Sequence, residues 1–474
     1  MSRRSPRRRR LALVTLATAA LAVSLIAAPT ASATAAPNVS CTASTLNAVQ
    51  SRILTETNAA RRSAGVTPLA ANAGLHVVAV DWSAQMAARQ TMSHNPNYTT
   101  QMPSGWNWAG ENVAYGQQPA NVTSAWLGST GHRANILNKS YTHIGIGVAC
   151  STAGRPYYTQ VFGGYAKTPT PSIPRYAGDN RYGTSAAVSK ATFSAGVPVV
   201  YLANGMNFPD ALSGAAAAGS VGGPVLLTST KTLSADAKSE LTRLKPRTIV
   251  VLGGPLAVSD AVVADARRYT TGTVTRAAGA NRYETAAAVS ARSFAPGASV
   301  VYLASGADFP DALSGAAAAG TIGAPVLLTT PGSLPEATRQ ELSRLAPARI
   351  VVLGGPIAVS DAVLNQARAY TSGNVTRVAG ANRYATSAAV SQSAYSPGVS
   401  VVYLANGLNF PDALSGAASA GSLGAPVLLT NPHDLPSVIA AELARLKPKK
   451  IVVLGGPGAV SDYVLFQAQK HLGG

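Results

Sequence analysis

The sequence predicts a multidomain α/β protein in which three copies of one folded unit follow an N-terminal domain. Two observations support this. From residue 175 onward the sequence repeats itself every 101 residues, and within each period short apolar segments alternate with helix-like ones. A period of this size indicates domain-sized units, because solenoid repeats have periods of 20–50 residues. A chain of 474 residues is also too long for a single hydrophobic core.

The period is exact in three separate segments: an octapeptide that ends in NRY, the run PDALSG and the run VVLGGP. They begin at Arg175, Arg276 and Arg377, at Pro209, Pro310 and Pro411, and at Val250, Val351 and Val452. No net insertion separates the copies. We therefore expect three equivalent units, at residues 175–275, 276–376 and 377–474.

Within the first unit, the apolar runs 197–203, 224–228 and 248–252 predict strands that are buried on both faces of a sheet. The intervening segments 183–194, 209–220, 234–245 and 259–269 predict helices. Pro209 and Asp210 suit a first helical turn, and Ser259 suits an N-cap. This alternation favours a parallel, Rossmann- or toprim-like α/β unit. Three identical head-to-tail interfaces favour closure into a pseudo-threefold ring.

Residues 1–33 predict a cleaved secretory signal peptide. Six arginines precede an apolar stretch at 11–28 and an Ala-Ser-Ala site at 31–33. An uncleaved membrane anchor is the alternative, and the adjacent arginines also permit a twin-arginine signal. No later stretch is long and apolar enough for a transmembrane helix.

The mature chain is basic. Without the six N-terminal arginines it has 32 basic and 19 acidic residues, a net charge of +13. Such a chain attracts polyanions, whether nucleic acid, anionic lipid or a phosphate-rich wall polymer. Composition alone does not choose among these.

Two cysteines, Cys41 and Cys150, remain after signal removal. In an exported protein an isolated pair is most simply one disulfide. It would close a long loop and stabilise the fold by about 4–5 kcal/mol in the chain-entropy model. The pair brackets one domain, and the Pro/Thr-rich segment 166–174 predicts an extended linker after it.

The three repeats closely resemble the type 2 cell wall-binding repeat of Gram-positive surface proteins. The resemblance rests on AGANRY, VVYLA, FPDALSG, PVLLT and VVLGGP. It implies a pseudo-threefold assembly of α/β units that binds an anionic secondary cell-wall polymer, either teichoic-acid-like or a phosphorylated polysaccharide, without a covalent bond. Nucleic acid is not an expected partner.

Two groups of residues are candidate polymer contacts. The first is an Asn-Arg pair in each repeat, because arginine forks onto phosphate and carboxylate, and the second is a leucine pair that lies near the polymer site in the family. They are Asn180, Arg181, Asn281, Arg282, Asn382 and Arg383, with Leu226, Leu227, Leu327, Leu328, Leu428 and Leu429.

Structural roles are the alternatives at these positions. Each arginine could pair with Asp210, Asp311 or Asp412, or bridge two repeats, and the leucines could belong to the core. The GGP loops follow a strand and precede a helix, so they could form a phosphate nest. They lack the spacing of a nucleotide-binding loop.

Residues 45–165 resemble the CAP superfamily of cysteine-rich secretory, antigen 5 and pathogenesis-related proteins. The resemblance rests on LTETNAAR in the first helix, MSH, GENV, GHRANIL and YTQVFG. It implies an α-β-α sandwich with a central cavity. In family members this cavity is lined by two histidines and two glutamates and sometimes holds a divalent metal.

His94 and Glu111 match two of these four positions. Tyr157 stands where the second histidine is expected, and the second glutamate is replaced within 126–129. His132 is a candidate to fill part of that space. His94, Glu111 and His132 could ligate zinc, and plain hydrogen bonding is the alternative, so we expect no obligatory cofactor.

Enzymatic activity is not the leading expectation for this domain. A His–Glu pair can act as a general base with its orienting group, but neither a serine nor a free thiol stands beside it as a nucleophile. We expect a secreted, wall-associated protein whose CAP domain binds a lipid, a glycan or a protein. A metal-assisted, peptidase-like hydrolase is the alternative, and a disulfide-stapled spacer is the third.

Overall fold

The computed structural model describes residues 41–103, 105–166, 173–207, 209–469 and 471–473. The predicted signal peptide and most of the predicted linker (167–172) lie outside these ranges. Within them, every helix is too short or too polar to cross a membrane.

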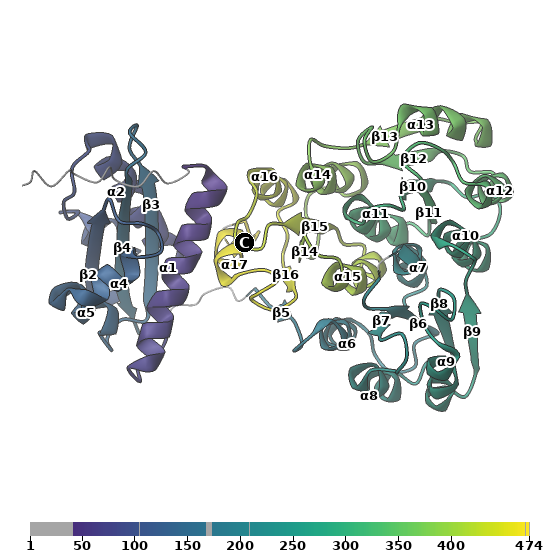
Figure 1. The fold of residues 1–474 in the computed structure, drawn as a ribbon, viewed down its shortest axis with the longest axis horizontal. Coiled ribbons are helices and arrows are strands. Elements are labelled where there is room, and N and C mark those ends of the chain that lie inside the picture. The colour runs from purple at the N-terminus through teal and green to yellow at the C-terminus, as the bar shows by residue number, and fades with distance from the viewer. Residues whose placement is uncertain (1–40, 104, 167–172, 208, 470, 474) are drawn as a thin grey trace, which may run out of the picture. The chain divides into compact units, whose positions relative to one another are not determined.

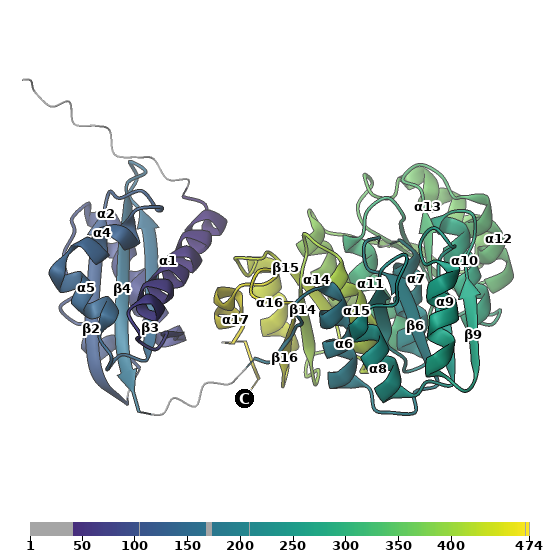
Figure 2. The same cartoon turned by 60° about the horizontal axis from the view of Figure 1, so that its bottom comes forward.

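The N-terminal domain is a four-stranded sheet between helices. Its strand order is β1-β3-β4-β2, with β3 and β2 antiparallel to β4 and β1 parallel to β3. The elements are α1 (Ala43–Ser63), β1 (Ala70–Ala71), α2 (Ala73–Arg89), α3 (Tyr98–Gln101), β2 (Trp106–Tyr115), α4 (Val122–Gly128), α5 (Thr130–Leu137), β3 (His143–Cys150) and β4 (Pro156–Tyr165). Helices α1, α4 and α5 cover one face and α2 covers the other (Figure 2). The predicted α-β-α sandwich is confirmed.

A fully buried arginine ties α1 to the loops around it. Arg61 is 0% exposed. Its guanidinium donates to the backbone carbonyls of Thr67, Ile136, Asn138 and Tyr141 at 2.7–3.1 Å. Burial of the cation lowers the pKa of Arg61. Since a buried charge is costly without partners, these four hydrogen bonds allow the side chain to remain inside.

The predicted disulfide is confirmed. Cys41 and Cys150 are bonded, with their Cα atoms 6.0 Å apart and a sequence separation of 109. The bond joins the segment before α1 to the end of β3, so it closes most of the domain into one loop.

The repeats contain the predicted helices and strands. The first has α6 (Arg181–Thr192), β6 (Val199–Asn204), α7 (Pro209–Ser220), β7 (Val225–Thr228), α8 (Ala235–Leu244), β8 (Thr248–Leu252), α9 (Asp260–Ala266) and η1 (Arg267–Tyr269). The second has α10 (Arg282–Ser293), β10 (Val301–Ser305), α11 (Pro310–Thr321), β11 (Val326–Thr329), α12 (Glu336–Leu345), β12 (Ile350–Leu353), α13 (Asp361–Ala367) and η2 (Arg368–Tyr370). The third has α14 (Arg383–Ala394), β14 (Val402–Asn406), α15 (Pro411–Ser422), β15 (Val427–Thr430), α16 (Ser437–Leu446), β16 (Ile451–Leu454) and α17 (Asp462–Gln469).

Each repeat is a parallel sheet with helices on both faces. In the first, Tyr201 and Ala203 of β6 face one core, and Val200 and Leu202 face the other. These side chains are at most 3% exposed, as expected of a strand buried on both faces. The sheet order is β7-β6-β8-β9 in the first repeat, and the other two follow the same pattern.

The fourth strand of each sheet was not predicted, and it links the repeats. Strands β9 (Thr273–Ala277) and β13 (Val375–Val378) span the boundaries predicted at 275/276 and 376/377 and join the preceding sheet. The third sheet takes its fourth strand, β5 (Arg175–Tyr176), from the start of the first repeat. Val453 of β16 is paired with Arg175, and Leu454 with Tyr176. The three units therefore form a closed ring.

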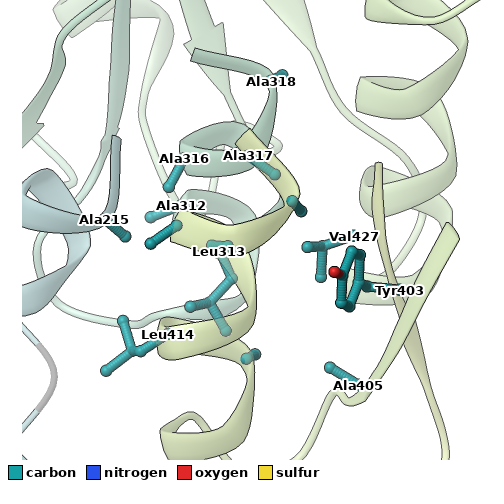
Figure 3. Packing of buried hydrophobic residues seen from close by; sticks show 14 of the residues in the cluster. Ala215, Ala312, Leu313, Ala316, Ala317, Ala318, Tyr403, Ala405, Leu414 and Val427 are labelled. Atoms are coloured by element: carbon teal, nitrogen blue, oxygen red, sulfur yellow. The ribbon is translucent and has the colours of Figure 1, made fainter. Parts of the chain in front are cut away.

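Helices α7, α11 and α15 pack against one another at the centre of this ring (Figure 1). Small residues form much of their contact surface, where Ala215 of α7 lies beside Ala312 and Ala316 of α11, with Leu313 and Leu414 close by (Figure 3). Near the C-terminal ends, Gly219, Gly320 and Gly421 meet. A Cβ on any one of them would lie 3.1–3.4 Å from the Cα atoms of the other two. Glycine permits this close approach, because a Cβ at any of the three would push the neighbouring helix backbones apart by a few tenths of an ångström.

Candidate functional site

The three candidate arginines each begin a helix at a junction between two repeats: Arg181 begins α6, Arg282 begins α10 and Arg383 begins α14. The preceding asparagines, Asn180, Asn281 and Asn382, are exposed N-caps. In each, Oδ1 accepts from the amides two and three residues ahead at 2.9–3.1 Å. These asparagines therefore orient the helix starts that carry the arginines.

Each arginine donates to a backbone carbonyl of its own repeat, and Arg181 and Arg383 also contact a ring of the neighbouring repeat. Nη1 of Arg181 donates to the Gly205 carbonyl at 2.6 Å, and Nη1 of Arg383 donates to the Gly407 carbonyl at 2.7 Å; Arg282 donates likewise to Gly306. Across the junction, the Arg181 guanidinium lies 6.0 Å from the Phe410 ring centroid. That of Arg383 lies 5.8 Å from the Phe309 ring. For Arg181 and Arg383 the structure agrees with the bridging alternative.

A carboxylate from the preceding repeat faces each arginine. Burial raises the pKa of Asp210, while a hydrogen bond with Thr285 and the charge of Arg282 counteract this shift. The same arrangement recurs with Asp311, Thr386 and Arg383, and with Asp412, Thr184 and Arg181. The charge of each arginine thus acts across a junction on one of these aspartates.

A cavity of about 410 Å³ lies at the junction of the first and second repeats. Three segments line it: Asn207, Pro209 and Asp210 around the start of α7, the loop 254–257 after β8, and the start of α10 with residues 279–282 and Thr285. Arg282 and the half-buried Asp210 share this cavity. Leu256, on its rim, is 95% exposed. The junction thus presents an arginine and polar groups to solvent.

A carboxylate lies against each GGP loop, at the place where a phosphate nest would hold its anion. Gly253 has φ +87°, and a Cβ there would overlap Oδ2 of Asp210. Gly354 and Gly455 have the same relation to Asp311 and Asp412. The space against each loop is thus filled by a carboxylate of the protein itself.

The leucine pairs are not polymer contacts, and that expectation is wrong. They lie in β7, β11 and β15, each at one edge of its sheet, where packing on both faces still covers them. Leu226, Leu227, Leu327, Leu328, Leu428 and Leu429 are each 0–1% exposed. The alternative, that they form the core, is correct.

In the CAP domain, His94 and Glu111 form a close pair. Nδ1 of His94 is 2.7 Å from Oε1 of Glu111, and the same oxygen accepts from the Asn95 amide at 3.0 Å. The side chain of His94 is 64% exposed and that of Glu111 is 2% exposed. The carboxylate therefore anchors a histidine whose ring faces solvent.

The second oxygen of Glu111, Oε2, is buried without a hydrogen-bond partner. Burial raises the pKa of Glu111, and the Asn95 amide and His94 counteract this shift. The Glu111 charge in turn adds to the effect of burial in raising the pKa of Tyr98. Tyr98 is thus a neighbour that the sequence motifs did not indicate.

His132 completes the surroundings of this pair without forming a ligand set. Burial and the charge of His94 lower the pKa of His132. Within the described part of the chain, however, no three His, Cys, Asp or Glu side chains are grouped to hold a metal ion. His94, Glu111 and His132 therefore do not fit a zinc site. Tyr157, at the expected position of the second histidine, is buried and stacks on Tyr115 at 5.8 Å.

The other CAP motif residues form a buried amide network. Nδ2 of Asn112 donates to Oε1 of Gln160 at 3.0 Å, and Nδ2 of Asn135 donates to Oδ1 of Asn112 at 2.9 Å. Nε2 of Gln160 donates to Thr57 at 2.9 Å. Because buried amides are stable only when satisfied, this network fixes α1, α5, β2 and β4 around the His–Glu pair.

Comparison with known families agrees with both resemblances. Residues 175–263, 276–364 and 377–465 match the family described as Cell wall binding domain 2 (CWB2). Together these matches cover more than half of the chain. Residues 54–162 match the Cysteine-rich secretory protein family, CAP.

Individual relatives match only part of their length. N-acetylmuramoyl-L-alanine amidase LytC of Bacillus subtilis (strain 168) is 29% identical over 303 residues, which cover 64% of this chain and 59% of LytC. Protein YkwD of the same organism is 38% identical over 112 residues, 22% of this chain and 44% of YkwD. The structure of Cwp8 from Clostridium difficile superimposes with a TM-score of 0.57 at 26% identity and covers 63% of this chain and 51% of Cwp8. The chain thus spans less than two thirds of each relative.

Proposed function

We propose that this chain, which belongs to the cell wall binding domain 2 family, is held non-covalently on an anionic cell-wall polymer and displays its CAP domain there. The protein is cell-wall-associated through its repeats. Export by the 1–33 signal peptide is part of the proposal, and so is the anionic nature of the polymer.

The observation that carries this proposal is the arginine at every junction. Arg181, Arg282 and Arg383 lie at equivalent places, and each is oriented by a capped helix start and a backbone carbonyl. A linear polyanion presents the same charged group many times along its length. Three such sites on one ring can engage it together, which raises retention by roughly 10²–10⁴ over a single site.

Purified Gram-positive walls provide the test. The mature chain is mixed with walls before and after acid extraction of their anionic polymers, and the bound fraction is measured by sedimentation. We expect binding to fall sharply on extracted walls and to weaken with salt, because exposed charge contacts are screened. Equal binding to extracted peptidoglycan would refute the polymer as the receptor.

For the CAP domain we propose binding of a lipid, a glycan or a protein partner. The amide network and the disulfide support this role, because they produce a rigid scaffold with one exposed histidine. Binding to extracted lipids and glycans, compared between the wild type and His94→Ala, tests whether this surface is the contact.

A second candidate function is hydrolysis at the same pair, favoured by the orphaned oxygen of Glu111 and the exposed ring of His94. With Glu111 ionised, Nδ1–H of His94 donates a hydrogen bond to Oε1. The other ring nitrogen, Nε2, is then unprotonated and can take a proton from water as a general base. Wall peptides are the first substrate to test, because the proposed anchor would hold the pair at the cell wall. Unchanged release of peptide from walls by His94→Ala and by Glu111→Gln would eliminate this candidate.

A further inference from the structure

The three junctions differ at three positions that surround the arginine. One position precedes the helix that carries the buried aspartate, one precedes the capping asparagine, and one follows the GGP turn. At the first junction they are Asn207, Ala280 and Leu256; at the second, Asp308, Ala381 and Ile357; at the third, Asn409, Asp179 and Gly458. In the first junction all three line the cavity.

The second junction contains an additional carboxylate beside its arginine. Oδ2 of Asp308 lies 3.8 Å from Nη2 of Arg383, and the Asp308 side chain is 60% exposed. It therefore lies where a ligand anion would approach that guanidinium. The first and third junctions have a neutral asparagine at this position.

The third junction also has an additional carboxylate, at a different position. Asp179 replaces an alanine that lines the cavity of the first junction. The first junction has a nearby acid too, Glu284, but both oxygens of Glu284 are engaged. They accept from the Ala280 amide and from Nδ2 of Asn281, each at 2.8 Å, and Glu284 is not among the cavity-lining residues.

The residue after the GGP turn adds an apolar contact at two junctions. Leu256 is 95% exposed and Ile357 is 96% exposed, so each presents nearly its whole side chain to solvent. Gly458 presents none. Apolar side chains this exposed gain free energy when a ligand covers them. A sugar substituent, which has an apolar ring face, offers such a cover and a bare phosphate does not.

We propose that the three junctions are unequal sites and that the one between the first and second repeats is the principal site for an acidic, sugar-bearing polymer unit. Arg282 takes the anionic group and Leu256 the apolar face of the sugar. Asp308 competes with the ligand anion for Arg383 and so weakens binding at the second junction. Asp179 weakens binding at the third junction in the same way. This ranking rests on the proposed polymer-binding function.

Substitutions that copy one repeat into another test the ranking in the full mature chain. The probes are immobilised poly(glycerol phosphate) chains, unsubstituted and glucosylated, at low salt. Asp308→Asn should tighten binding about two- to fivefold and Asn207→Asp should weaken it by a similar factor, as expected for one exposed charge pair. Leu256→Gly should weaken binding to the glucosylated chain more than binding to the unsubstituted chain.

Matched controls carry the same charge changes away from the junctions. Glu336→Gln removes a carboxylate from α12 that is 63% exposed and also pairs with one arginine. Asn365→Asp adds a charge on the exposed side of α13. Each control should shift binding less than its junction counterpart, and circular dichroism should confirm that all variants are folded.

The outcomes separate the two proposals. If the wild type binds but Asp308→Asn behaves like Glu336→Gln, the ranking is overturned and the polymer function stands. If the wild type and every variant fail to bind either probe at low salt, poly(glycerol phosphate)-type recognition is refuted together with the ranking. Equal losses on both probes for Leu256→Gly would refute the assignment of the sugar to Leu256.

Discussion

Replacing the three axial glycines, Gly219, Gly320 and Gly421, by alanine should destabilise the ring of repeats. In each, an added Cβ would meet only backbone atoms of the other two central helices as its nearest neighbours, at 3.1–3.4 Å. Backbone atoms in packed helices cannot move aside individually. The helices must therefore separate, and their alanine contacts loosen with them.

The magnitude follows from two opposing effects. Overpacking a close contact costs about 1–3 kcal/mol, and replacing a helical glycine by alanine gains about 0.5–1 kcal/mol. One substitution should therefore lower the free energy of unfolding by about 1 kcal/mol. The triple variant should lose more than three times that amount, about 3–6 kcal/mol, because all three Cβ atoms crowd the same space.

Urea titration of the mature chain measures this loss with an internal reference. All four tryptophans, Trp82, Trp106, Trp108 and Trp126, lie in the CAP domain, so tryptophan fluorescence follows that domain and circular dichroism follows mainly the repeats. Gly332→Ala is the control, since a Cβ there meets nothing within 4 Å. A triple variant within about 0.5 kcal/mol of the wild type would refute the packing argument.

Three further predictions concern the CAP domain. Arg61→Lys should lower the free energy of unfolding of this domain by about 3–5 kcal/mol, because an ammonium group cannot donate to all four carbonyls and the remaining buried acceptors lose their donors. The urea midpoint followed by tryptophan fluorescence measures this loss. Replacing both Cys41 and Cys150 by serine should lower the free energy of unfolding by up to about 5 kcal/mol in the loop-entropy model. The same titration measures this loss, and an unchanged midpoint would contradict the prediction. Because the pKa of Glu111 is raised from 4.5, its protonation stabilises the fold below that value, and this contribution is lost as pH rises through the higher folded pKa. Glu111→Gln should remove this part of the pH dependence, which a series of melting temperatures against pH would show.

The sequence was sufficient to predict the main elements of each repeat, because continuous apolar runs such as 224–228 specify buried strands. It was not sufficient for β5, β9 and β13. These strands are short and half polar, and β5 has its partner β16 some 280 residues away. A local pattern cannot indicate pairing over that distance.

Motifs in the sequence identified the residues of the candidate sites but not all of the contacts between them. The arginines and the His94–Glu111 pair were identified by motif, and their bridging and pairing geometry agrees with alternatives that the residues suggested. The leucine pairs stand within continuous apolar runs, and that pattern predicts side chains that are buried on both faces of a sheet. Tyr98 and the crossing of Asp210 to Thr285 of the next repeat depend on tertiary contacts that no motif encodes.

The pairing of β5 with β16 determines how many copies such a chain can hold. Because the last sheet is completed by the first residues of the first repeat, a chain with one copy deleted or duplicated would have to close around a different axis or leave its last sheet one strand short. The central helices, whose glycines meet three at a time, impose the same count. Copy number, which drifts readily in linear arrays of near-identical segments, is here fixed by the geometry of closure.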